Sequence, residues 1–177
     1  MATASLNRGR AAGGLLMLLG AWGALIPFVG PYFGFAFTPD KAWAYTSGRV
    51  WLSVVPGAAA CLGGLIVLAG GRMAAVGALL AAAGGAWFAI GRAVVGFGAA
   101  SYHLSPGAPV VAAGSVFGPA AMRFLEPLAF FYGLGIVIVF CAALALGEVI
   151  VAHSAPRWFG NQATDAIETT DQYGAAY

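Results

Sequence analysis

Residues that could carry out chemistry are few in this chain of 177 amino acids. It contains eight Lys and Arg, six Asp and Glu, two His and two Cys. The sequence has no HExxH, no P-loop and no GxGxxG after a strand, and in Gly114-Ser115-Val116-Phe117-Gly118 the serine stands one place too early for a nucleophile elbow. We therefore expect a protein that is not an enzyme.

The potential ligands for a metal or haem are too scattered to form a site. His103 lies in the loop 97–126 and His153 at the inner end of the last apolar run, and no Cys or His pair has ligand spacing, so we expect no metal and no cofactor. Cys61 and Cys141 each fall inside a long apolar run, where a thiol usually behaves as a small hydrophobic group. A structural disulfide is not expected either.

One set of charged residues could bind a ligand: Arg49, Arg92, Arg123 and Glu126. Aromatic residues accompany them, namely Tyr32, Phe33, Phe35, Phe37, Trp43, Tyr45, Trp51 and Tyr102. The set could attract an anionic head group or an acidic ligand at the outer leaflet. Alternatively, Arg92 forms a structural ion pair with Glu126 or Asp40 within an aromatic belt, because a partly buried charge needs a partner. We favour the structural interpretation.

Composition indicates the environment of these residues. Hydrophobic residues make up 61% of the chain and charged residues 8%, with a mean hydropathy of +0.88. Soluble domains carry roughly 25% charged residues, so lipid must replace water over most of the surface. The net charge of +2 is too small and dispersed for binding nucleic acid. Abundant Ala and Gly, and more Arg than Lys, suggest a bacterial genome of high GC content.

Hydropathy predicts an all-α polytopic membrane protein whose transmembrane domain, residues 11–153, is a four-helix bundle with two external loops. A signal peptide is disfavoured because the first apolar run is too long and no A-x-A site follows it. The spans are expected at about 11–30, 51–70, 73–96 and 127–152, between an N-terminal segment, 1–10, and a polar acidic tail, 154–177.

Four crossings place both termini on the same side. The basic residues near the helix ends divide evenly, with Arg8, Arg10, Arg72 and Arg157 on one side and Lys41, Arg49, Arg92 and Arg123 on the other. The N-terminal pair and the short loop carrying Arg72 count most, so we expect both termini in the cytoplasm of a cell with this protein in its plasma membrane. The apolar loop 97–126 could cap the bundle, lie in the interface as a helix over 119–125, or re-enter the membrane.

The spans carry no ionisable side chain near the bilayer midplane, which disfavours coupled transport. Small residues recur at four-residue spacing, as Gly77, Ala81, Gly85 and Ala89, and such stripes allow close helix contacts within the bundle or with another subunit. We expect a non-catalytic accessory or scaffold subunit that contacts membrane lipids and other membrane subunits or a second copy, with the acidic tail as a docking segment. The alternative is a binder or carrier of a lipid or other anionic amphiphile at the outer leaflet.

Overall fold

The computed structural model describes residues 2–33, 35–37, 41–102, 109–111, 125 and 127–154. Its long helices are α1 (Ala2–Val29), α3 (Val55–Ala69), α4 (Ala74–Tyr102) and α6 (Gly133–Ser154). Shorter elements connect them: η1 (Gly30–Phe33), β1 (Phe35–Phe37), α2 (Ser47–Arg49), η2 (Val50–Val54), η3 (Gly71–Met73), β2 (Pro109–Val111) and η4 (Leu128–Tyr132). The predicted acidic tail lies outside the described residues from position 155 onward.

Four helical segments are long and apolar enough to cross a membrane, which confirms the predicted multi-pass arrangement at the level of helix length and composition. They run over Gly9–Tyr32, Ser47–Ala69, Gly71–Val95 and Gly133–Val151. The helices extend beyond the predicted spans, since α1 begins at Ala2 and α4 ends at Tyr102. Neither extension contains proline, so every residue in them has the backbone N–H that helical hydrogen bonding requires.

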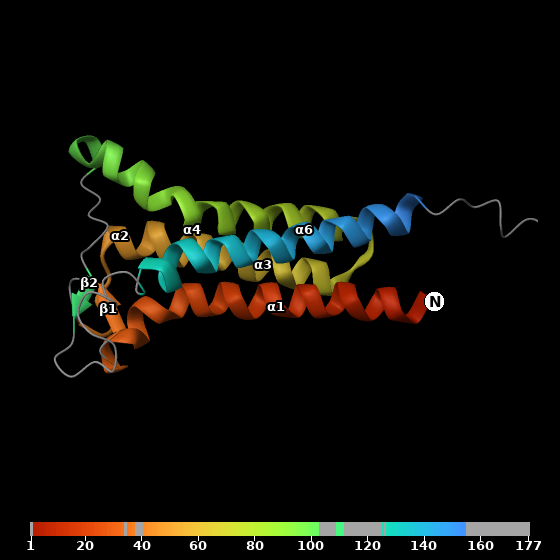
Figure 1. The fold of residues 1–177 in the computed structure, drawn as a ribbon, viewed down its shortest axis with the longest axis horizontal. Helices are drawn as coiled ribbons and strands as arrows, with labels where there is room; N and C mark the ends of the chain where they lie inside the picture. The colour runs from red at the N-terminus through yellow and green to blue at the C-terminus, as the bar shows by residue number, and fades with distance from the viewer. Residues whose placement is uncertain are drawn as a thin grey trace, which may run out of the picture.

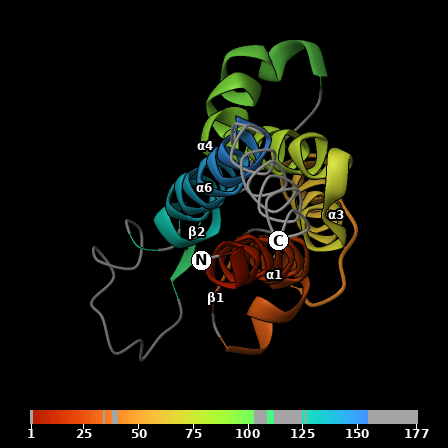
Figure 2. The ribbon, with the colours of Figure 1, turned by 90° about the vertical axis from the view of Figure 1, so that its right-hand side faces the viewer.

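The long helices form an antiparallel bundle in which each packs against its neighbour in the chain (Figure 1). Viewed along the bundle, α6 closes the ring against α1, and this contact is less extensive than the three between consecutive helices (Figure 2). One end of the bundle holds the start of α1, the α3–α4 turn and the end of α6, and we call it the termini end. The opposite end, with α2, β1 and β2, is the loop end.

The two long connections meet at the loop end. β1 and β2 pair antiparallel, with Phe35 opposite Val111 and Phe37 opposite Pro109. This pairing places part of the second connection, residues 109–111, against the first, as in the capping arrangement. The helix considered over 119–125 falls outside the described residues except for Leu125.

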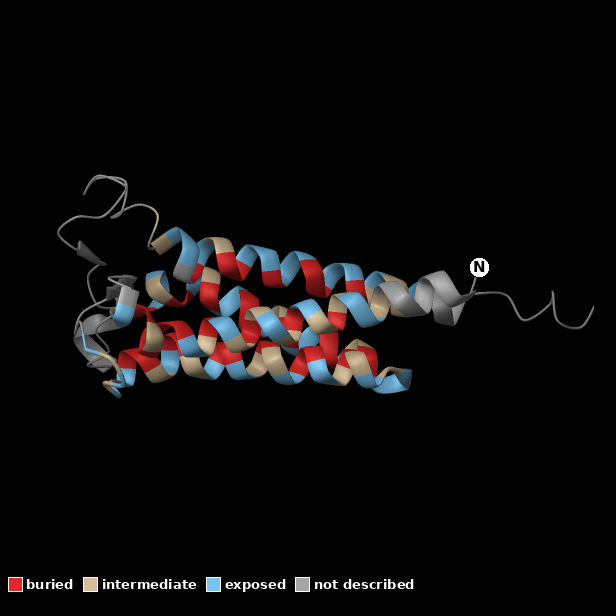
Figure 3. Ribbon diagram, turned by 90° about the horizontal axis from the view of Figure 1, so that it is seen from below, coloured by how far each residue is buried: buried red, intermediate tan, exposed pale blue. Residues whose placement is uncertain are grey.

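Buried and exposed side chains divide cleanly between the inward and outward faces of the helices (Figure 3). Leu16, Phe88 and Ile138 come from three different helices and are fully buried in the centre. Large apolar side chains cover the outward faces, as on α6, where Phe140 is 62% exposed. Such a surface suits hydrocarbon rather than water.

Glycines bring α1 and α3 into backbone contact. A Cβ added to Gly20 would lie 2.7 Å from the carbonyl oxygen of Gly57, and one added to Gly57 would lie 2.7 Å from that of Gly20. Two helical turns away, a Cβ on Gly64 would lie 2.7 Å from the carbonyl oxygen of Gly13. Any side chain at these positions would push the helices apart, so the spacing of the two helices depends on glycine.

The α3–α4 hairpin is equally close. A Cβ on Gly77 would lie 2.7 Å from the carbonyl oxygen of Gly63, and one on Gly84 would lie 2.5 Å from that of Pro56. The turn itself contains Gly70 and Gly71 with φ of 73° and 71°. This left-handed conformation favours glycine and permits the chain to reverse within a few residues.

We expect Gly20→Ala to destabilise the protein by about 1–3 kcal/mol, because the new methyl group would overlap the backbone of α3, which cannot move without separating the helices. Gly14→Ala is the matched control on the same helix. A Cβ there meets nothing within 4 Å, so this variant should be unchanged or slightly more stable. Thermal unfolding in detergent measures both, and equal effects would contradict the packing argument.

Candidate functional site

The charged residues singled out from the sequence are described in part. Arg49 lies in the first turn of the second candidate span and Arg92 near the end of the third, so both are at the loop end. Arg123 and Glu126, and the alternative partner Asp40, fall outside the described residues. The predicted ion pair of Arg92 with Glu126 or Asp40 therefore also lies outside them.

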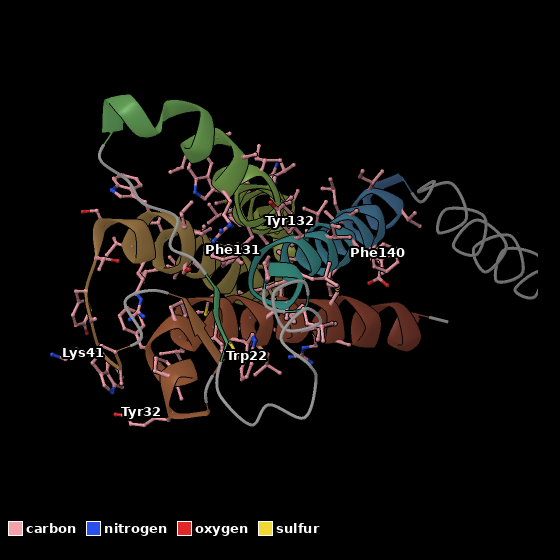
Figure 4. All side chains as sticks on the ribbon, turned by 60° about the vertical axis from the view of Figure 1, so that its left-hand side comes forward. Trp22, Tyr32, Lys41, Phe131, Tyr132 and Phe140 are labelled. Atoms are coloured by element: carbon pink, nitrogen blue, oxygen red, sulfur yellow. The ribbon has the colours of Figure 1, made fainter. Side chains whose placement is uncertain are left out.

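Arg49 organises the connection that precedes α3. Its side chain is only 8% exposed, and Nη1 donates to the carbonyl oxygens of Lys41 at 2.9 Å and Ala44 at 3.1 Å. Its backbone N–H donates to the Thr46 hydroxyl at 3.2 Å, which caps the helix start. Arg49 thus ties the segment from 41 to 46 to the beginning of the second span, while the Lys41 side chain points outward (Figure 4).

An aromatic cluster fastens the same segment to the end of α1. The buried Phe28 ring stacks on Trp43, with centroids 5.8 Å apart, and contacts Tyr45 at 5.1 Å. Trp43 has a φ of 56°, an unfavourable backbone conformation for a residue with a Cβ. Ring stacking and the Arg49 hydrogen bonds on either side of Trp43 hold this conformation.

Arg92 contacts η4, the turn that precedes α6. Its guanidinium carbon lies 4.9 Å from the centroid of the Phe131 ring, which is buried and belongs to η4 (Figure 4). A cation over an aromatic face gains electrostatic energy that grows as water is removed. Arg92 thereby links the end of the third span to the start of the fourth.

A hydrogen bond that sequence reasoning missed joins α3 and α4. In the π-helical turn η2 the N–H of Val55 donates to the carbonyl of Val50, and the next donor in this series would be residue 56. That residue is Pro56, which has no N–H, so the π-helical series of hydrogen bonds cannot continue to the Trp51 carbonyl. The indole Nε1 of Trp87 donates to it at 2.9 Å. The signal available in the sequence was the proline inside an apolar run.

The small-residue stripe lies on α4, and its contacts are divided between the two neighbouring helices α3 and α6. Gly77 and Ala81 pack against Gly63 on α3. The other half faces α6, where a Cβ on Gly85 would lie 2.9 Å from the Gly135 carbonyl oxygen and one on Gly135 would lie 2.7 Å from the Ala89 nitrogen. The structure therefore places all of Gly77, Ala81, Gly85 and Ala89 in contacts inside one chain. The partner residue Gly135 was not singled out from the sequence.

The described residues bring together groups that position backbone and rings rather than groups that react. Among them, no three His, Cys, Asp or Glu side chains lie close enough to hold a metal ion. Cys61 and Cys141 are free thiols on different helices. The interactions observed at the loop end are hydrogen bonds from side chains to backbone carbonyls and the cation–π contact of Arg92.

Trp87→Phe should destabilise the protein by about 1 kcal/mol, because it keeps an aromatic ring but removes the hydrogen bond that the indole N–H donates to the Trp51 carbonyl. Trp51→Phe is the matched control, since the same change there retains the backbone acceptor. Thermal unfolding in detergent compares them. An equal loss from both variants would show that ring packing, rather than the hydrogen bond, accounts for the effect.

Comparison of the chain with protein-family models, with curated proteins and with solved structures found no match in any of the three.

Proposed function

We propose that this protein is a non-catalytic accessory or scaffold subunit of a larger membrane assembly, and that a transmembrane helix of a partner subunit covers the outward face of α1. One observation carries the proposal. Trp22 lies near the middle of the candidate span Gly9–Tyr32 and is 56% exposed, on the side of α1 away from the other helices (Figure 4).

Trp22 is unusual for a tryptophan that faces lipid. Its indole N–H can only donate, and within the described part of the chain no acceptor meets it. Water is scarce at this depth of a bilayer, so an unpaired donor costs free energy. Tryptophan accordingly concentrates at membrane interfaces, where its N–H reaches polar groups.

The other tryptophans that the structure describes follow these rules. Trp43 belongs to the connection at the loop end and Trp51 to the first turns of the second span, both near the interface. Trp87 lies deeper, but its N–H is hydrogen bonded to the Trp51 carbonyl. Among these tryptophans, Trp22 is the exception. An acceptor on a helix of a partner subunit would satisfy its indole N–H.

The surface around Trp22 has the form of a helix-packing strip. Leu15, Leu18, Trp22 and Leu25 are all exposed and follow one another at spacings of three and four residues along one face of α1. A partner helix lying along this strip would bury the leucines by van der Waals packing and could offer Trp22 a side-chain hydroxyl, amide or freed backbone carbonyl.

Binding of an anionic amphiphile at the loop end ranks second. It requires arginines that are available to a ligand, whereas Arg49 is buried and donates to two backbone carbonyls. Arg92 is likewise engaged with the Phe131 ring. These contacts favour a structural role for both residues.

Trp22→Phe should reduce the amount of partner subunit that co-purifies in mild detergent, because it removes the donor while keeping an aromatic ring. Phe140→Leu is the control, since Phe140 is similarly exposed near the middle of its span on α6 but has no polar atom. Mass spectrometry of the purified material, alongside thermal unfolding to confirm folding, measures the effect. Absence of any stoichiometric protein partner with the unaltered chain would contradict the proposal.

We further propose that the termini end faces the cytoplasm of the plasma membrane, because the N-terminal arginines and the short Arg72 turn lie there. In a background lacking Cys61 and Cys141, a membrane-impermeant thiol reagent applied to intact cells should modify Ser47→Cys and spare Arg72→Cys. Both positions are exposed in the structure. The reverse labelling pattern would invert the orientation.

A further inference from the structure

Two exposed arginines lie at the termini end of the bundle, and the contacts within the chain use neither side chain. Arg10 is the second residue of the candidate span Gly9–Tyr32, and Arg72 is the second residue of the candidate span Gly71–Val95. Within the described part of the chain, neither side chain forms a hydrogen bond or an ion pair. Both positive charges therefore stand at the edge of the apolar spans, at the level of lipid head groups.

The packing of α1 on α3 brings Arg10 to the end of α3. A Cβ added to Gly13 would lie 2.9 Å from the backbone nitrogen of Leu68, so Gly13 faces the last turn of α3. Arg10 precedes Gly13 by three residues, which places it on the same face of α1 and one turn closer to the termini end. Because the two helices are antiparallel (Figure 1), that turn lies beside Ala69 and Gly70, where α3 ends.

Arg72 follows the same helix end. It stands three residues after Ala69, so the Cα atoms of the two residues are at most about 11 Å apart. Arg10 and Arg72 thus flank the end of α3, and their long side chains can converge on one anion there. A guanidinium group can donate to two oxygens of the same phosphate, which makes arginine well suited to bind one.

The acidic residue nearest to this pair in the described part of the chain faces a different helix. It is Glu148, whose buried Oε2 atom lies 3.2 Å from the position that a Cβ on Gly9 would occupy. Gly9 and Arg10 are consecutive, so they point about 100° apart around α1. The carboxyl group meets α1 on its α6 side and Arg10 lies on its α3 side. The two arginines therefore keep their positive charge.

Apolar surface continues from the arginines into the membrane. Leu62, Leu65 and Ala69 are exposed and follow one another at spacings of three and four residues along the outward face of α3. Met73, next to Arg72, is 57% exposed. A ligand with an anionic head and apolar chains matches this combination, because its head would meet the arginines while its chains lie along α3.

We propose that Arg10 and Arg72 bind the phosphate of an anionic phospholipid of the phosphatidylglycerol type. The phosphodiester accepts hydrogen bonds from both guanidinium groups, and the acyl chains lie against Leu62 and Leu65. Phosphatidylcholine has the same phosphate, but its quaternary ammonium cancels the charge and is repelled by the two arginines, so the site favours the anionic lipid. The site needs no partner subunit and is independent of the contact proposed for Trp22.

The test is native mass spectrometry of the purified protein after equilibration with mixed micelles that hold equal amounts of dioleoyl phosphatidylglycerol and dioleoyl phosphatidylcholine. The unaltered protein should retain the glycerol lipid in preference to the choline lipid. Arg10→Gln and Arg72→Gln should each lower retention of the glycerol lipid about fivefold, the effect of one basic residue at a membrane surface. Thermal unfolding confirms that each variant is folded.

Arg8→Gln is the matched control, because it removes the same charge from the same end of α1. Position 8 lies about 200° around the helix from position 10, so this variant should keep the preference of the unaltered protein. Equal retention of the two lipids by the unaltered protein would overturn the proposal. An equal loss in Arg8→Gln would also overturn it, because the attraction would then belong to the whole charged end. Displacement of the bound lipid by soluble glycerophosphoglycerol at equal concentration would overturn the assignment to a lipid.

Discussion

Close contact between helix backbones is the constraint on which the rest of this structure depends. In lipid, apolar side chains gain little by leaving the solvent, so helices associate through short-range packing that small residues permit. Gly20 against Gly57 and Gly63 against Gly77 set the separation of three helices, and Gly85 against Gly135 adds the fourth. These glycines all make contacts between helices of the same chain. The proposed contact with a partner subunit therefore uses a different surface.

The same constraint determines how polar backbone groups are treated at the loop end. Pro56 has no N–H to continue the π-helical series to the Trp51 carbonyl, and Trp87 donates to that carbonyl from the adjacent helix because α3 and α4 are so close. Arg49 does the same for the carbonyls of Lys41 and Ala44 in the preceding connection. Residues that composition alone would assign to an aromatic belt or an anion site therefore act as hydrogen-bond donors to the protein's own backbone.

One polar group takes no part in these contacts. Within the described part of the chain, the indole N–H of Trp22 meets no acceptor near the middle of its span. Trp22 belongs to α1, whose contact with α6 is the least extensive between neighbouring long helices. A helix of the proposed partner subunit at this depth would supply the acceptor.

The sequence by itself determined the number and approximate position of the membrane-length helices. Each spanning helix needs about 20 predominantly apolar residues, and this requirement is met within a single segment, whatever the helix packs against. It also identified Gly77 and Gly85 as packing residues from their spacing. Only the tertiary structure decided that this stripe faces two different helices, that Arg49 donates to backbone carbonyls, and that the Trp87 indole donates to the Trp51 carbonyl, 36 positions away in the sequence. The physical reason is that hydropathy and spacing are properties of one helix, whereas a hydrogen bond or a backbone contact requires the rotation and depth of two helices at once.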